Sequence, residues 1–355
     1  MRVVQVINNA GLDKGGAERL ARMLHLDLVA DGIDAHLIAV QDCDAGALPN
    51  GETLGFPSAR SAGAPAALRR RLRALVTPQT VVHAHLFPTI GIVSMLARFG
   101  QITAPLAMTE HNTWNRRRGR VAGRWVDRAL YTQFDQIAAI SDQTRTALLV
   151  SYPHLANKVT VVTNGAELRF SKPVEKPDDA PILLTAARLA PAKNIDAALR
   201  ALAPLTDRPW HYVIAGEGDE RPRLEALTQE LRLTDRVTFA GHVADLTDLL
   251  TRSEILILPS LWEGFGLAAV EAMNASMAVL ASDVPGLRDI VEPVGSPLVA
   301  PDDIAGMTTA LADLLDNQEK RRGLGRAGFD RAAIFDKTRM KDSYVAMWRR
   351  MLTHG

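Results

Sequence analysis

The chain of 355 residues has very little cysteine: Cys43 is the single one. One cysteine excludes an intrachain disulfide and any metal site built from several thiolates, and it fits a reducing cytoplasm. No apolar run reaches the ~18 residues that a membrane-spanning helix needs. The N-terminal MRVVQVINNA runs directly into a strand-like pattern and has no signal-peptide core. We therefore expect a cytoplasmic protein whose only contact with a membrane is peripheral.

Excess charge is also missing, because the formal net charge is only +1. This near balance argues against nucleic-acid binding over the whole surface. The two halves differ, however. Residues 1–168 carry 18 Lys and Arg against 13 Asp and Glu, whereas the remainder carries 23 against 27. The basic surplus therefore belongs to the first half.

Short apolar runs alternate with helical patterns along both halves, and the length predicts two domains. In the first half the expected strands are 3–7, 35–40, 80–84, 105–108, 136–140 and 158–162. In the second half they are 182–186, 211–215, 237–240, 254–258 and 278–281. This rhythm predicts α/β domains with parallel sheets.

A polar segment that holds three prolines, RFSKPVEKPDDAP at 169–181, separates the two series and is expected to be the interdomain linker. The first domain then covers residues 1–168 and the second covers 182–335. Residues 336–355 are expected to form a helix that packs back on the first domain. Its apolar residues are helically spaced: Tyr344, Met347, Trp348 and Met351.

The stretch from 255 to 276 carries the strongest functional pattern. An apolar strand leads into the loop Glu263-Gly264-Phe265-Gly266, and a helix is expected from 267 to 275. The N-terminus of a helix presents N–H groups and partial positive charge to an anion such as phosphate. Glu263 and Glu271 flank this position, and carboxylates accept hydrogen bonds from sugar or ribose hydroxyls. Each part alone fits an ordinary turn or a solvated helix, and only the combination favours a ligand site.

Three further loops follow expected strands. Arg188 and Lys193 bracket one of them, where a guanidinium and an ammonium can grip a diphosphate. Gly216 begins Gly-Glu-Gly-Asp after the next strand and is expected to shape a nucleotide-base pocket. In the first half, Gly16 belongs to the GGAE turn before a helix expected over 17–30. Such a turn lets an anion approach the backbone, although a structural turn is an equal alternative.

Two arginine clusters account for the basic first half. In the segment 66–76, four arginines share a helical pattern with an apolar face: Arg69, Arg70, Arg71 and Arg73. Such a helix is expected either to lie on an anionic membrane or to pack on the core with a solvated basic face. The second cluster comprises Arg116, Arg117, Arg118, Arg120 and Arg124. Together they predict an acidic surface or a pyrophosphate-bearing acceptor as partner.

Three histidines lie near expected strand ends. We expect His83 and His85 to face opposite sides of the sheet. His111 follows the carboxyl end of another strand, where open α/β sheets place ligand-binding loops. His111 is therefore the best catalytic candidate of the three, against the alternative of a packed side chain.

These patterns together resemble the retaining glycosyltransferases of the GT-B fold, and specifically the family 4 group. The resemblance covers nearly the whole chain. Its most specific part is the run from Glu263 to Glu271, which is similar to the family's E-x7-E motif. The Arg188 and Lys193 pair, the GGAE turn and the returning C-terminal helix also match. The resemblance implies two Rossmann-like domains that face each other across a cleft.

The resemblance also implies roles for individual residues. Arg188 and Lys193 would hold the diphosphate of a nucleotide-sugar donor. Glu271 would bind the ribose hydroxyls, and Glu263 a hydroxyl of the transferred sugar. Other donor contacts would come from His111, which faces the sugar, and from the backbone at Gly16, Gly264, Phe265, Gly266 and Leu267. The chain departs from the family at Asn194, where a glycine often follows the lysine.

The expected reaction needs no metal, because two cations and a helix N-terminus can stabilise the departing diphosphate. The D-x-D sequence at 42–44 is interpreted as a turn. A UDP-sugar is favoured over GDP-mannose as the donor, and a lipid-linked saccharide is the favoured acceptor. Three alternatives remain: a glycosidase that uses the paired carboxylates, a sugar-nucleotide binding protein without transfer activity, and an epimerase of the same fold.

Overall fold

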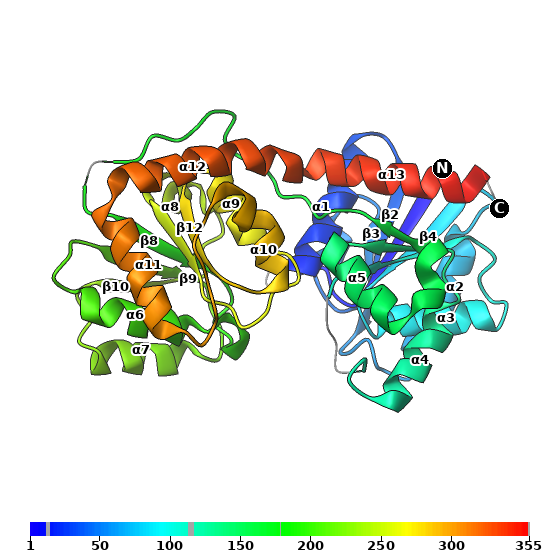
Figure 1. The fold of residues 1–355 in the computed structure, drawn as a ribbon. Coiled ribbons are helices and arrows are strands. Elements are labelled where there is room, and N and C mark those ends of the chain that lie inside the picture. Colours follow the sequence, from blue (N-terminus) through cyan, green and yellow to red (C-terminus); the bar gives the residue numbers. More distant parts are fainter. Residues whose placement is uncertain (12–14, 113–116, 178, 354–355) are drawn as a thin grey trace. The chain divides into compact units, whose positions relative to one another are not determined.

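The computed structural model describes residues 1–11, 15–112, 117–177 and 179–353 (Figure 1). The chain forms two compact units. The first contains Met1–Gly165 together with Lys337–Gly355, and the second contains Ala166–Asp336. The first division therefore falls three residues before the expected boundary at 168. Part of the segment 169–181 is fastened to the second unit, since the amide of Phe170 donates to Asn274 Oδ1 at 3.0 Å.

Among the described residues, the first unit has one parallel sheet in the order β3-β2-β1-β4-β5-β6-β7. Its strands are β1 (Arg2–Ile7), β2 (Asp34–Gln41), β3 (Gly51–Phe56), β4 (Thr80–His85), β5 (Leu106–Glu110), β6 (Gln136–Ala139) and β7 (Val159–Val161). Its α-helices are α1 (Gly16–Ala30), α2 (Ala64–Leu75), α3 (Thr89–Arg98), α4 (Val121–Tyr131), α5 (Asp142–Ser151) and α13 (Lys337–Thr353). Short 3-10 turns are η1 (Asp44–Ala47) and η2 (Pro153–Lys158).

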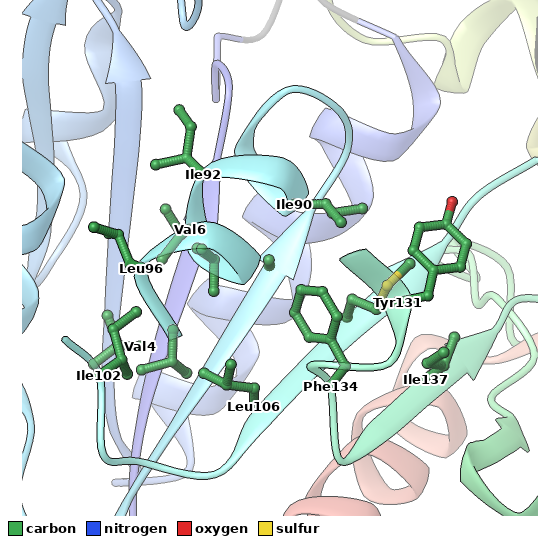
Figure 2. Close-up of a cluster of buried hydrophobic side chains, with 14 of the residues drawn as sticks. Val4, Val6, Ile90, Ile92, Leu96, Ile102, Leu106, Tyr131, Phe134 and Ile137 are labelled. Atoms are coloured by element: carbon green, nitrogen blue, oxygen red, sulfur yellow. The ribbon is translucent and has the colours of Figure 1, made fainter. Parts of the chain in front are cut away.

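Alternate residues of β1 enter two separate cores, as the two-residue period of a strand requires. Val4 and Val6 pack with α2 and α3 on one face of the sheet, whereas Ile7 packs with Leu37 and α1. Figure 2 shows part of the larger core, in which side chains of β1 and β5 meet those of α3 and the end of α4. Burial on both faces explains why these strands are apolar nearly throughout.

The second unit repeats this plan with a parallel sheet in the order β10-β9-β8-β11-β12-β13. Its strands are β8 (Ile182–Ala186), β9 (His211–Ala215), β10 (Val237–Gly241), β11 (Ile255–Leu258), β12 (Ala278–Ser282) and β13 (Leu298–Val299). Its α-helices are α6 (Ile195–Leu202), α7 (Arg221–Glu230), α8 (Thr247–Arg252), α9 (Leu267–Asn274), α10 (Pro285–Val291), α11 (Ile304–Asp316) and α12 (Gln318–Ala332). Its 3-10 turns are η3 (Pro191–Lys193), η4 (Ala203–Leu205), η5 (Glu292–Val294) and η6 (Ala333–Phe335).

Two edge strands, β3 and β13, were not expected from the sequence. Each pairs with one neighbour only, and each is short or rich in glycine and polar residues. Such edges lack the apolar run by which a central strand is recognised.

The C-terminal helix α13 packs on the first unit, and this expectation is confirmed. Tyr344 Oη lies 3.0 Å from Thr109 Oγ1, and Trp348 Nε1 donates to His83 Nδ1 at 2.9 Å. Lys337 Nζ pairs with Asp27 on α1 at 3.0 Å. Among the helices that the structure describes, none is both long and apolar enough to cross a bilayer.

Candidate active site

The loops that follow β8, β9 and β11 come together in the second unit. Parallel strands place their carboxyl ends at one edge of a sheet, and two backbone hydrogen bonds tie the loops there. The amide of Leu189 donates to the carbonyl of Glu217 at 2.8 Å, and the amide of Leu261 donates to that of Ala192 at 2.9 Å. Arg188, Lys193, Gly216 and Glu263 therefore belong to one connected set of loops.

An ion pair joins two of the predicted donor-binding residues. Lys193 Nζ lies 2.5 Å from Glu263 Oε1, and Ser260 Oγ donates to the same carboxylate oxygen at 3.0 Å. Arg188 is exposed and makes no hydrogen bond or ion pair with any described residue. The site therefore offers one unengaged guanidinium, together with an ammonium that a competing anion can draw from its carboxylate.

The glycine loop leads into α9, as predicted. Of the backbone amides of Phe265, Gly266 and Leu267, one already has an acceptor. The N–H of Gly266 donates to the carbonyl of Gly286 at 3.2 Å, so this amide is not directed at a ligand. Among the described residues, the amides of Phe265 and Leu267 have no acceptor, and they keep the anion-binding capacity of a helix N-terminus. The contact predicted between the Gly266 amide and the donor stays a prediction, and in this structure the amide is engaged within the unit. The reason is the close packing of the loop on α10.

Glu271 lies on α9 and is buried, at 7% exposure. Burial takes its carboxylate largely out of solvent, and the predicted partner is a ribose hydroxyl of the donor. A carboxylate that is already ordered and desolvated accepts a hydroxyl without losing much further side-chain freedom. This position is compatible with the ribose-binding role that the resemblance implies.

The backbone at Gly216 explains why a glycine stands there. Its φ is 148°, and a Cβ at this position would lie 1.8 Å from the carbonyl oxygen of Ala187. The loop after β9 can therefore lie against the loop that carries Arg188 only if the residue has no side chain.

Asn194 occupies a left-handed conformation at the start of α6, with φ 51° and ψ 35°. Its side chain donates from Nδ2 to the carbonyl of Pro301 at 2.9 Å. Glycine and asparagine are the residues that adopt this conformation at low cost. The departure from the family's glycine therefore preserves the backbone turn behind Lys193.

In the first unit, Gly16 is the first residue of α1 and is exposed. Gly15 precedes it in an extended conformation, and no described side chain caps the helix. The first amides of this 15-residue helix therefore keep their capacity to bind an anion. Residues 12–14, which complete the turn, lie outside the described part of the chain.

His83, His85 and His111 form one buried cluster. The prediction that His83 and His85 face opposite sides is wrong, because residues two apart on a strand share a face. Their rings stack with centroids 4.5 Å apart and an interplanar angle of 5°. His85 Nδ1 lies 3.4 Å from His111 Nε2, and His85 Nε2 donates to Gln5 Oε1 at 3.2 Å.

Burial keeps this cluster neutral. It lowers the pKa of His83 to about 3 and that of His111 to about 4, and it lowers the pKa of His85 well below its ordinary value. Because Gln5 Oε1 accepts from His85 Nε2, neutral His85 has Nδ1 as its acceptor, and His111 donates from Nε2. His111 thus presents a neutral imidazole, which suits hydrogen bonding to a hydroxyl better than proton transfer at neutral pH.

The second arginine cluster is divided between the interior and the surface, whereas an anion-binding surface was expected. Arg118 is buried in an ion pair with Glu110, which also accepts a hydrogen bond from Tyr131 at 2.9 Å. Arg117 pairs with buried Asp127 at 2.6 Å. Arg120 and Arg124 are exposed, and Arg116 lies outside the described residues.

The first cluster, on α2, shows the core-packed alternative. Leu68 and Leu72 are buried in the core, so the apolar face is not available to a membrane. Arg71 pairs with Glu52 at 2.5 Å. The other arginines, Arg69, Arg70 and Arg73, line an open groove of about 560 Å³ beside Phe56.

Sequence reasoning missed the residues that support the site. A Cβ at Gly286 would lie 2.3 Å from the carbonyl oxygen of Glu263, so the glutamate loop depends on this glycine. The signal was a Pro-Gly pair three residues beyond an apolar run, which is typical of a turn after a strand. Gln5 gave no signal, because its role depends on a contact 80 residues away. Ser260 was not singled out, although its partner Glu263 lies only 3 residues further along the chain. Within the described residues, no group of three or more His, Cys, Asp or Glu side chains is placed to hold a metal ion.

Comparison with known proteins assigns this architecture. The family model for glycosyl transferases group 1 matches residues 167–331, and that for glycosyltransferase family 4 matches residues 14–170. Glycogen synthase of Mycobacterium tuberculosis is 30% identical over 284 residues, which cover 74% of this chain and 67% of that protein. The chain belongs to the family 4 glycosyltransferases. Another member, the MMP alpha-(1->4)-mannosyltransferase of Mycolicibacterium hassiacum, is 27% identical over 322 residues, 84% of this chain and 77% of that protein.

Solved structures show that this glycosyltransferase has the GT-B fold of its family. Sucrose-phosphate synthase from Thermosynechococcus elongatus superposes with a TM-score of 0.84 at 23% identity, over 100% of both chains. Anabaena HepE in complex with UDP-glucose superposes with a TM-score of 0.81 at 18% identity, over 99% of this chain and 100% of that one. The predicted pair of Rossmann-like α/β domains with a returning C-terminal helix is thus confirmed.

Proposed function

We propose that this glycosyltransferase moves a sugar from a UDP-sugar to a hydroxyl of a lipid-linked saccharide or polysaccharide, with retention of configuration and without a metal. The observation that carries the proposal is the Lys193–Glu263 ion pair, which lies on the same connected set of loops as exposed Arg188. Two cations and the start of α9 lie on one loop set, and no such arrangement is needed to hydrolyse an oligosaccharide.

The ion pair gives donor binding a defined first step. The donor's diphosphate competes with Glu263 for Lys193 and also binds Arg188, whose planar donors match phosphate oxygens. Glu263 is then released to accept a hydrogen bond from a hydroxyl of the donor sugar. The carboxylate that holds the lysine in the ligand-free site thus becomes a sugar-binding group in the occupied one.

The same groups act on the transition state. Breaking the bond between sugar and phosphate adds negative charge to the departing diphosphate, which Arg188, Lys193 and the amides at the start of α9 stabilise. The phosphate oxygen that leaves the anomeric carbon takes the proton of the acceptor hydroxyl, which attacks from the same face. Buried neutral His111, whose Nε2 donates to His85, accepts a hydrogen bond from a sugar hydroxyl at Nδ1 and is not the general base.

Support for a UDP-sugar comes from HepE, whose structures contain UDP and UDP-glucose. A thermal-shift panel of UDP-glucose, UDP-galactose, ADP-glucose and GDP-mannose tests the donor, because a ligand that binds only the native form raises its melting point. We expect the largest shift with a UDP-sugar, and we expect Arg188→Ala to remove it. A larger shift with GDP-mannose would overturn the choice of nucleotide.

Product analysis tests the reaction itself. Transfer with retention from an α-linked donor gives an α-linked product in the presence of EDTA. A β-linked product, or activity that requires added metal, contradicts the proposed mechanism. Donor binding without transfer to any acceptor supports the binding-protein alternative, and isomerised donor supports the epimerase.

The charge of the first half supports the choice of acceptor and of the place of action. Its basic surplus suits an acidic lipid-linked acceptor at the cytoplasmic face of a membrane, where the protein makes peripheral contact. Extraction of the labelled product into organic solvent identifies a lipid-linked acceptor. A product found only in the aqueous phase contradicts it.

A further inference from the structure

Helix α4 of the first unit, labelled in Figure 1, exposes large apolar side chains and buries its acidic one. Asp127 and Tyr131 are its buried residues, at 0% and 1% exposure. Val121, Trp125 and Val126 are instead exposed, at 67%, 68% and 51%. Surface helices normally bury the apolar stripe and expose the polar one, so this helix exposes what others bury.

A polar network fixes the helix in this orientation. Asp127 accepts hydrogen bonds from Arg117 Nε at 2.6 Å and from Tyr152 Oη at 3.2 Å. Tyr131 donates to buried Glu110 at 2.9 Å. A rotation of α4 about its axis would bury more of its apolar residues. It would also leave the buried charged groups without their partners. The outward apolar face is therefore built into the fold.

The exposed side chains of α4 form one continuous face. Successive residues of a helix advance by 100°, so the following residues lie within an arc of about 140°. We call this set the α4 outer face: Val121, Ala122, Trp125, Val126 and Ala129, all exposed. Helix α3 lies against α4, since Ser94 Oγ donates to the carbonyl of Leu130 at 2.9 Å. On α3, Met95 and Phe99 are also exposed.

The charge beside this face has one sign. Arg124 and Arg128 lie along one side of the α4 outer face, and Arg120 precedes the helix. Asp127, the acidic residue of α4, is buried and paired with Arg117. An apolar face with tryptophan, flanked by arginines, matches the boundary between headgroups and acyl chains of an anionic bilayer.

We propose that the α4 outer face docks this glycosyltransferase on an anionic lipid bilayer, with Trp125 and Val121 inserted and Arg120, Arg124 and Arg128 at the headgroups. This assignment deepens the peripheral contact proposed above and rests on it. It differs from the sequence-based expectation for α2, whose apolar face is buried in the core. Helix α2 contributes at most charge, through Arg70 and Arg73.

Co-sedimentation of the full chain with vesicles tests the proposal. One set of vesicles is phosphatidylcholine alone, and the other contains 30% phosphatidylglycerol, about the anionic content at which basic segments bind. Wild type is expected to bind the anionic vesicles, and Val121→Ser with Trp125→Ser is expected to lower the partition coefficient at least tenfold. Val150→Ser is the matched control, because Val150 is 81% exposed on α5, outside the α4 outer face.

Arginine variants test whether the charged residues that bind lie on α4 or on α2. Competition with inorganic phosphate tests whether they bind a lipid headgroup or free phosphate. Arg120→Ser with Arg124→Ser is expected to weaken binding to anionic vesicles about tenfold and to make the remaining binding less sensitive to salt. Arg70→Ser with Arg73→Ser is expected to have a smaller effect. Inorganic phosphate at 10 mM, about ionic-strength matched with chloride, is expected to compete no better than chloride.

Three results would overturn the proposal: no wild-type binding to anionic vesicles, unchanged binding of the Val121→Ser, Trp125→Ser variant, or loss of a dimer instead of vesicle binding in that variant. The dimer is detected by analytical ultracentrifugation without lipid. Circular dichroism confirms that each variant is folded. UDP-sugar thermal shifts, measured on the same samples, report on the proposed function separately, because the vesicles contain neither donor nor acceptor.

Discussion

At the carboxyl edge of its sheet, the first unit has buried groups that satisfy one another. His83, His85 and His111 are neutral, and Glu110 is paired with Arg118. At the same edge of the second unit, Arg188 is exposed, and Lys193 and Glu263 hold each other near the surface. Two sheets of the same design thus end in opposite chemistry. In the first unit, the charged groups at this edge pair with one another and stabilise the fold. In the second unit, they can exchange their partners for a charged ligand.

The largest difference is expected in stability. Arg118→Met leaves Glu110 buried without its cation and should lower the free energy of unfolding by about 3–5 kcal/mol. Arg188→Met should change it by less than about 0.5 kcal/mol, because exposed side chains contribute little. Urea denaturation of both variants measures the contrast. Equal stability of the two variants would mean that the buried pair is not what distinguishes the units.

For catalysis we expect the opposite: substitutions at the edge of the second unit's sheet should have the larger effect. Arg188→Ala, Lys193→Ala and Glu271→Ala are each expected to lower kcat/KM about a hundredfold, or about 3 kcal/mol, because each removes one stabilising contact to the donor. Arg200→Ala is the control, since Arg200 is an exposed arginine on α6. Steady-state transfer assays with melting curves measure the effect. Near-normal turnover in all three variants would contradict the assignment of these residues to the donor site.

Low pH should destabilise the protein through the buried histidines at the carboxyl edge of the first unit's sheet. The pKa of His111 is lowered to about 4 and that of His83 to about 3, whereas an unfolded histidine titrates near 6.5. The unfolded chain therefore binds more protons below pH 6.5, and stability is lost as the pH falls toward 4. At pH 5 each histidine should cost about 2 kcal/mol.

Urea denaturation at pH 7.5 and pH 5 measures this loss in wild type and in His83→Gln. The variant should lose about 2 kcal/mol less between the two pH values, because it has one buried imidazole fewer. Identical losses in the two proteins would show that the cluster already takes up protons in the native state.

The smallest effect on stability is expected for substitutions of Asn194, which follows Lys193. Asn194→Ala places a Cβ-bearing residue without a local hydrogen bond in the left-handed region and should destabilise the protein by about 1 kcal/mol. Asn194→Gly should be nearly neutral in stability and in transfer. Thermal melting measures both variants. A neutral alanine would show that the αL turn does not need asparagine or glycine.

The central strands could be predicted because they are buried on both faces. Ile182–Ala186 and His211–Ala215 were expected at the bounds that the structure has. The edge strand Gly51–Phe56 could not, because its apolar residues are interrupted by glycine and polar residues. Local sequence therefore defines the central strands and also the edge strands β7 and β10, whereas β3 depends on the neighbour to which it pairs.

The candidate site was predictable where function depends on a loop after a strand. The order strand, Glu263, glycines and helix is local, and the structure has it at those positions. The occupied amide of Gly266 was not predictable, because its acceptor, Gly286, is brought there by packing. Likewise, the sequence shows that Arg118 is basic, but only the fold shows that it is buried against Glu110.

The first unit is assembled from two parts of the chain, residues up to Gly165 and the helix that begins at Lys337. During synthesis the ribosome must complete the entire second unit before Tyr344 and Trp348 can cover Thr109 and His83. The nascent N-terminal part therefore waits with an incomplete core while its neighbour folds. A stop codon shortly before α13 would damage the part of the protein that was made first.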